Sequence, residues 1–186
     1  MTVYNAKKIV MESAPLLIFL LALEVLVGQL LNSRESLVSI PVILALIPVI
    51  NGVGGNIGSV LGARLASGLH TGYIDTNLRG QVLTKNVTGT LILGLIAFSV
   101  LAVAIYAILP LLGIGVDVIG FGKLMIIMVG SGLLLTITLI VLSLVTAIYS
   151  FKRGLDPDNY VIPIVTTSGD VLGISSLLLL VYLIGI

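Results

Sequence analysis

From Ile162 to Ile186 the chain carries no charged side chain except that of Asp170. An apolar run of this length matches the roughly 20 helical residues, at about 1.5 Å each, that cross about 30 Å of hydrocarbon. Asp170 would then lie well inside the bilayer, where a carboxylate costs about 2.5–3.5 kcal/mol and is expected to face water, a cation or a partner. The hydroxyls of Thr166, Thr167 and Ser168 precede it within one turn and add oxygens that hard cations prefer. Asp170 is therefore a candidate cation site; an aspartate hydrogen-bonded to a neighbouring helix is the alternative.

The composition of the whole chain agrees with a membrane location. Of its 186 residues 58% are hydrophobic and 9% charged, and the mean hydropathy is +1.27. This favours an all-α, polytopic membrane protein and, with no cysteine, excludes disulfides and thiolate metal sites. The net charge of +1 argues against a nucleic-acid partner. With a single histidine and no nucleophile–base pairing, phosphate-binding glycine loop or HExxH motif, we do not expect an enzyme.

Five membrane-spanning helices are predicted, all within one membrane domain that covers residues 1–186. The expected spans are at about residues 14–31, 38–69, 87–109, 123–149 and 160–186. The second is too long for one straight crossing, and Pro41, Pro48 and the Asn51–Gly55 cluster should kink or break it.

The distribution of basic residues predicts the orientation. With five spans, the side of the N-terminus holds Lys7, Lys8, Arg64, Arg79, Lys85, Lys152 and Arg153, and the other side holds Arg34 and Lys123. Cytoplasmic loops are the ones enriched in Lys and Arg. We therefore expect a cell-membrane protein (plasma or inner membrane) with its N-terminus in the cytoplasm and its C-terminus outside.

The second span contains glycines and amides at an unusual density. Gly54, Gly58 and Gly62 form a doubled G-xxx-G ridge, which permits close approach of another helix. Helix packing is a sufficient explanation for the glycines. It does not explain Asn51 and Asn56, whose amides would need partners in lipid. The functional interpretation is that glycine-loosened backbone and Asn oxygens line a hydrated path.

Three further polar groups lie at or near the spans, and two of them have two interpretations each. Glu24, near the middle of the first span, is either a proton or cation site or a neutral group hydrogen-bonded within the bundle; we favour the second, because no polar residues crowd it in sequence. Asp156, Asp158 and Asn159 precede the fifth span and are either a helix-capping turn or a cation-gathering vestibule. For His70, at the end of the second span, contact with lipid headgroups is an adequate explanation.

Two of these segments carry a family resemblance. Pro48–Gly62, with its Gly-Gly-Asn core, resembles the second membrane helix of the MgtE magnesium channel family and its solute-carrier relatives in animals. Asp156-Pro-Asp-Asn, followed by Pro163-Ile-Val-Thr-Thr-Ser-Gly-Asp170, resembles the start of that family's fifth helix, whose motif aspartate binds magnesium in the pore. The Ala14-Pro-Leu-Leu opening is also similar.

The resemblance implies a homodimer with helices two and five of both subunits around a central pore. It implies Mg²⁺ as the transported ion, with Mn²⁺, Co²⁺ or Ca²⁺ also possible, and Asp170 as the metal-binding residue. The residues that would line the pore are Asn51, Gly54, Gly55, Asn56, Thr166, Thr167 and Gly173.

In one respect the chain departs from this family. Bacterial MgtE proteins carry a cytoplasmic N-terminal domain and a CBS pair that gate the pore, whereas only a short segment precedes the first span here. Such gating would need a separate regulatory subunit. Two other functions stay open: a proton-coupled divalent cation carrier that uses Glu24 and Asp170 as relay carboxylates, and a non-transporting membrane scaffold subunit.

Overall fold

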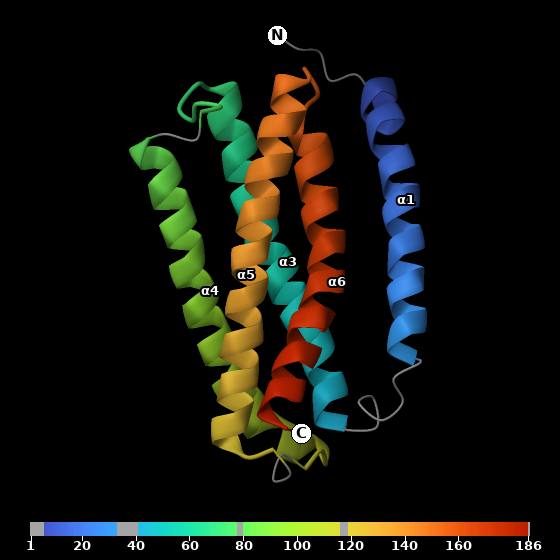
Figure 1. Ribbon diagram of the computed structural model, residues 1–186, viewed down its shortest axis with the longest axis vertical. Helices are drawn as coiled ribbons and strands as arrows, with labels where there is room; N and C mark the ends of the chain where they lie inside the picture. Colours follow the sequence, from blue (N-terminus) through green and yellow to red (C-terminus); the bar gives the residue numbers. More distant parts are fainter. Residues whose placement is uncertain (1–5, 33–40, 78–79, 116–118, 186) are drawn as a thin grey trace.

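The computed structural model describes residues 6–32, 41–77, 80–115 and 119–185, and this part of the chain contains helices and no strand. The elements are α1 (Ala6–Asn32), α3 (Pro41–His70), α4 (Gln81–Ile108), the 3₁₀ turn η1 (Leu109–Leu112), α5 (Phe121–Lys152) and α6 (Pro157–Ile184). Five of these helical segments are long and apolar enough to cross a membrane. Successive long helices run in opposite directions (Figure 1). The predicted all-α class with five membrane-spanning helices is therefore confirmed.

The core of the bundle lies where α3, α5 and α6 meet. These three helices pack against one another, and α4 packs mainly against α5. Aliphatic side chains fill the centre, among them Leu61 of α3, Leu135 and Leu139 of α5, and Val165 of α6, all at most 1% exposed. Burial of apolar surface of this kind is ordinary helix packing, and it fixes α6, the carrier of Asp170, against both α3 and α5 (Figure 1).

Helix α1 lies at the edge of the bundle and packs on α6 (Figure 1). Large apolar side chains point outward from it: Ile18 is 70% exposed and Phe19 61%. A soluble protein would not display a whole helix of this kind to water, whereas lipid solvates it at no cost. The bundle is therefore that of a multi-pass, membrane-embedded protein.

The break expected in the second span is absent, because α3 is one continuous helix from Pro41 to His70. Pro41 is the first helical residue, where a missing N–H leaves no bond unmade. Pro48 removes a single hydrogen bond, to the carbonyl of Leu44, and the helix on both sides of it is packed into the core. The helices also extend past the predicted spans. The third begins at Gln81 rather than about residue 87, because a polar first turn can continue a helix beyond the hydrocarbon.

Several basic residues lie at helix ends, and the alternating direction of the helices brings these ends together. The C-terminal ends of α3 and α5 and the N-terminal end of α4 lie at the same end of the bundle as the chain's N-terminus (Figure 1). This end carries Arg64, Lys85, Lys152 and Arg153. Arg34 and Arg79 lie outside the described residues, as do the side chains of Lys7 and Lys8. Which end faces the cytoplasm stays a prediction.

Candidate functional site

Small residues bring α3 and α6 into close contact at four successive levels. A Cβ atom placed on Gly62 would lie 2.7 Å from Val161 Cγ1, and one placed on Gly169 would lie 3.5 Å from the Cα of Gly55. From one end to the other, the contacts are Gly62 with Val161, Gly58 with Val165, Gly55 with Thr166 and Gly169, and Asn51 with Gly173. Each step advances about one turn on both helices, as expected for an antiparallel pair in fixed register. The packing role predicted for Gly58 and Gly62 is therefore present.

Asp170 directly follows Gly169, which lies beside the backbone of Gly55 of α3, and is partly buried. The polar side chains that act on its carboxylate are Glu24 of α1, which repels it, and Asn51 of α3, as a hydrogen-bonding neighbour. Among the described residues no Lys or Arg forms an ion pair with it. Asn51 is the neighbouring-helix amide that the alternative reading of Asp170 requires, but an amide does not neutralise a carboxylate. The carboxyl groups of Glu24 and Asp170 are therefore close enough to interact, at a level of the bundle where no described basic side chain pairs with Asp170.

The side chain of Asn51 has a second property of interest. Its Oδ1 atom is buried and has no hydrogen-bond partner within the described part of the chain. It occupies the place that a Cβ on Gly173 would take, so Gly173 makes room for the amide by having no side chain. Leaving a buried polar atom unpaired costs about 1–3 kcal/mol. The oxygen is therefore a buried acceptor whose hydrogen-bonding capacity is unused within the described part of the chain, on a side chain that neighbours Asp170.

The other residues predicted to line the path divide into two groups. Thr166 lies next to Gly55, and its hydroxyl donates to the Ile162 carbonyl at 3.0 Å, which leaves its oxygen lone pairs free. Within one protomer Gly54 and Asn56 are not at this place: Gly54 packs against Leu135 of α5, and Asn56 is exposed. The protomer thus assembles Asn51, Gly55, Thr166, Asp170 and Gly173, but neither Gly54 nor Asn56.

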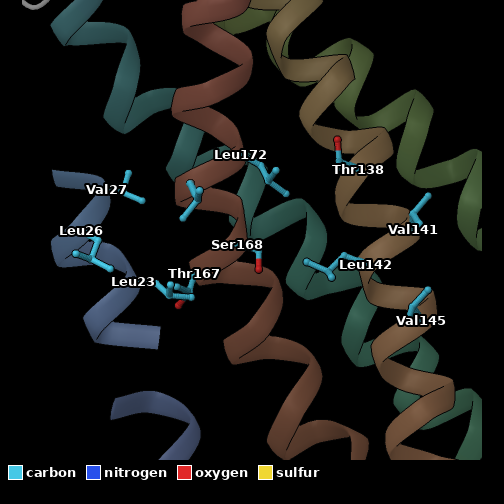
Figure 2. Close-up of a pocket in the computed structure, with 11 residues that line it drawn as sticks. Leu23, Leu26, Val27, Thr138, Val141, Leu142, Val145, Thr167, Ser168 and Leu172 are labelled. Atoms are coloured by element: carbon cyan, nitrogen blue, oxygen red, sulfur yellow. The ribbon is translucent and has the colours of Figure 1, made fainter. Parts of the chain in front are cut away.

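Thr167 and Ser168 face a different space, a groove of about 590 Å³ between α1, α5 and α6 (Figure 2). Its lining is almost entirely aliphatic: Leu23, Leu26, Val27, Thr138, Val141, Leu142, Val145, Thr167, Ser168, Val171 and Leu172. An apolar groove of this kind suits hydrocarbon rather than a cation. The expectation that Thr167 lines the same path as Thr166 therefore does not hold within one protomer, because adjacent helical residues point about 100° apart.

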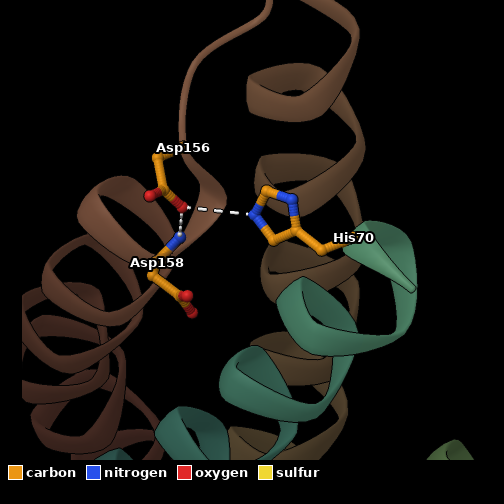
Figure 3. A group of neighbouring side chains, drawn as sticks. All are labelled: His70, Asp156 and Asp158. Carbon is orange, nitrogen blue, oxygen red and sulfur yellow. Dashed lines mark hydrogen bonds and ion pairs between the residues drawn. The ribbon is translucent and has the colours of Figure 1, made fainter. Parts of the chain in front are cut away.

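The capping reading of Asp156 holds, since its carboxylate accepts a hydrogen bond from the backbone N–H of Asp158 at 3.1 Å. The same carboxylate lies 3.4 Å from Nε2 of His70 (Figure 3). Asn159 instead donates to Glu12 Oε2 of α1 at 3.0 Å. The sequence analysis did not predict that His70 lies beside Asp156. The order of the helices gave a signal for it, because the end of α3 and the start of its antiparallel neighbour α6 lie at the same end of the bundle.

One comparison with known proteins identifies the family of this chain. A family model described as MgtE, divalent cation transporter, matches residues 47–180. The match runs from the first turns of α3 to near the end of α6 and includes Asn51, Gly55 and Asp170. No curated protein and no solved structure gives a significant match. The family match covers most of the chain, and the protein belongs to the MgtE family of divalent cation transporters.

Proposed function

We propose that this protein transports Mg²⁺ across the cell membrane along a path lined by α3 and α6, with Asp170 as the metal-binding residue. The observation that carries the proposal is the pairing of an uncompensated Asp170 carboxylate with the unpartnered oxygen of Asn51 at one level of the bundle. An intramembrane carboxylate with no basic partner is costly and marks an ion path more often than a packing site.

The ion is transported with most of its water. Magnesium loses water reluctantly and is usually held through one or two carboxylates while it keeps several waters. The site provides that kind of contact: the carboxylate of Asp170, the amide oxygen of Asn51 and the hydroxyl oxygen of Thr166. A water-mediated site selects by the size of the hydrated ion, so Mn²⁺, Co²⁺ or Ca²⁺ would enter with lower preference.

The functional unit in this proposal is a symmetric homodimer. In one protomer, a face of α3 formed by Gly52, Asn56, Ala63 and Ser67 is exposed within the membrane span. Lipid offers the Asn56 amide no hydrogen-bond partner. A second copy packed across a two-fold axis would cover this face, give Asn56 a partner, and close the path beside Asp170 with residues of both subunits.

The remaining part of the proposal concerns topology. The excess of Lys and Arg at the N-terminal end of the bundle supports a cytoplasmic N-terminus and an external C-terminus in the cell membrane.

One observation favours a second candidate, a proton-coupled carrier. Glu24 acts on the Asp170 carboxylate, and within the described residues it forms no hydrogen bond of its own. The bundle-bonded Glu24 that we favoured from the sequence is therefore not seen in one protomer. Two interacting carboxylates that exchange one proton for one metal ion would form a relay.

The test is Mg²⁺ uptake into proteoliposomes that contain the purified chain and an ion-sensitive dye. Asp170→Asn preserves the shape of the side chain and removes its charge, and it should abolish uptake. The matched control is Asp75→Asn, an exposed carboxylate outside the spans, which should leave uptake unchanged. Wild-type uptake by Asp170→Asn would refute the proposed site, and a wild-type chain that shows no uptake at all would favour the scaffold alternative.

The same vesicles separate channel from carrier when a pH dye is added. A channel keeps Mg²⁺ flux in Glu24→Gln, with no proton movement linked to the metal. A carrier moves protons in step with Mg²⁺ and loses that coupling in Glu24→Gln.

The dimer is tested by disulfide crosslinking, which is clean here because the chain contains no cysteine. A single cysteine at the exposed α3 face, Asn56→Cys, should crosslink two copies in membranes. Ile96 lies on α4 and is 55% exposed, and a single cysteine there, Ile96→Cys, should not crosslink two copies. Equal crosslinking at the two positions would contradict the two-fold arrangement.

A further inference from the structure

His70, Asp156 and Asp158 form a compact side-chain cluster at the end of the bundle away from the C-terminus (Figure 3). Each offers one ligand atom, and these atoms lie within 4.8 Å of one another. His70 Nε2 and Asp156 Oδ1 are already 3.4 Å apart. His70 ends α3 and the two aspartates begin α6, so the cluster joins residues that are 86 positions apart in the chain.

Within the described part of the chain, the two carboxylates of the cluster have one basic neighbour, the imidazole of His70. No Lys or Arg in the described part of the chain forms an ion pair with either aspartate. The nearby Arg153 lies instead over the Tyr149 ring, 5.1 Å from its centroid. Capping of α6 uses one oxygen of Asp156, and the carboxylate of Asp158 has no hydrogen-bond partner among the described residues.

The imidazole also contacts a third helix. The His70 ring packs edge-on against Phe151 of α5, with ring centroids 5.8 Å apart. Its Nε2 lies on the side of Asp156, at 3.4 Å from Oδ1, and a ligand that already makes packing contacts loses less entropy when a metal binds. Three elements therefore converge on the site: α3 with the imidazole, α6 with the carboxylates and α5 with the aromatic support.

The geometry is close to that of a bound metal. Ligands at about 2.0–2.2 Å from one ion lie at most about 4.4 Å apart. The ligand atoms here all lie within 4.8 Å of one another, so movements of the side chains alone would bring them to that spacing. His70 and Asp156 are about half exposed, at 47% and 45% of the side chain, so both can make that movement.

We infer that His70, Asp156 and Asp158 form a second metal site, specific for borderline divalent transition metals such as Zn²⁺, Co²⁺ and Ni²⁺. The class follows from the donors, because imidazole nitrogen is a preferred ligand of these metals, whereas Mg²⁺ and Ca²⁺ require oxygen. The site is chemically distinct from Asp170. It ties the C-terminal end of α3 to the N-terminal end of α6, the two helices of the proposed path, but it does not depend on that proposal.

The test uses the full chain in detergent, free of any polyhistidine tag and stripped with a chelator. Co²⁺ is titrated in and followed by its visible absorption, and Zn²⁺ is then added as competitor. His70→Ala removes the nitrogen ligand. Loss of a residue that only supports a metal ligand already weakens binding about 10–100-fold, so loss of the ligand itself should weaken Co²⁺ binding by at least that much. Asp156→Asn is a second variant that keeps the α6 cap, because Asn caps helices as well as Asp does.

Two controls separate this site from the rest of the molecule. Asp75→Asn removes a carboxylate at the same end of the bundle and should bind Co²⁺ with wild-type affinity and spectrum. Asp170→Asn removes the proposed transport site and should keep the visible absorption of imidazole-bound Co²⁺ that His70→Ala loses. Equal Co²⁺ affinities for wild type, His70→Ala and Asp156→Asn would overturn the inference. Loss of Mg²⁺ transport in Asp170→Asn with an unchanged Co²⁺ spectrum would show that the two sites are independent.

Discussion

Replacement of Gly173 by alanine is the change that tests the site geometry most directly. The added methyl group would occupy the position of Asn51 Oδ1, and it would also lie 3.4 Å from Leu135 Cδ2 in the core. The Leu135 side chain is fully buried and cannot easily move aside. The Asn51 amide must therefore leave its place beside Asp170. We expect Gly173→Ala to lower Mg²⁺ uptake strongly while the bundle still folds.

The size of the effect on stability can be estimated from the contacts. Inserting a methyl group into a well-packed core costs about 1–3 kcal/mol. If the cost arises from Asn51, it should nearly disappear in an Asn51→Ala background, where the methyl group meets empty space. The coupling energy between the two substitutions should then be about 1–2 kcal/mol, within the range for residues in direct contact. Gly169→Ala is the matched control, because its methyl group would make an ordinary contact, 3.5 Å from Gly55 Cα.

The assay is unfolding of the four proteins of this double-mutant cycle in mixed micelles, followed by circular dichroism because the chain has no Trp. Uptake of Mg²⁺ is measured on the same preparations. Additive destabilisation by the two substitutions would refute the reasoning, since it would mean that Gly173 does not hold Asn51 in place. Destabilisation by Gly169→Ala as large as that by Gly173→Ala would also count against it.

Three further changes have effects that the structure fixes in sign. Gly132→Ala should strongly destabilise the fold, because its methyl group would overlap the fully buried Phe98 ring. Thermal unfolding should show that the free energy of unfolding falls by more than about 3 kcal/mol, as expected when a core is disrupted. Ser143→Ala should leave stability unchanged or raise it. The buried hydroxyl of Ser143 has no hydrogen-bond partner in the described structure, and leaving such a group unpaired costs about 1–3 kcal/mol, which the substitution removes. A clear loss of stability in the same unfolding assay would contradict this. Hydrogen bonds from Asn77, chiefly from its side-chain amide at 2.9 Å, lower the pKa of Asp75. A carboxyl whose pKa is lowered in the folded state stabilises the fold at pH values above its ordinary pKa of about 3.9. This contribution is lost as the pH falls through the folded-state pKa, so Asn77→Ala should lower stability slightly at neutral pH but not in strong acid. Equal losses of stability at both pH values would rule this out.

The sequence by itself determined the architecture of the protein. The length of the apolar runs predicts the five spans and their alternating direction across the membrane. The cost of a charge inside such a run marks Asp170 as exceptional. Both are properties of consecutive residues. The close approach of another helix to Gly58 and Gly62 was also predictable, because residues four apart share one face of a helix. The α6 cap at Asp156 followed from local turn chemistry. The break expected at Pro48 was wrong because packing on both sides of α3 outweighs one lost hydrogen bond.

Only the tertiary structure decided which of these residues meet. Asn51 and Asn56 look equivalent in sequence, yet one is placed beside Asp170 and the other is exposed. His70 reaches Asp156, and Glu24 acts on Asp170, across helices that are distant in the chain. The physical reason is that partners across helices depend on the register and rotation of each helix about its axis. Those are set by the summed packing of many side chains in the core, and no short segment of sequence contains that sum.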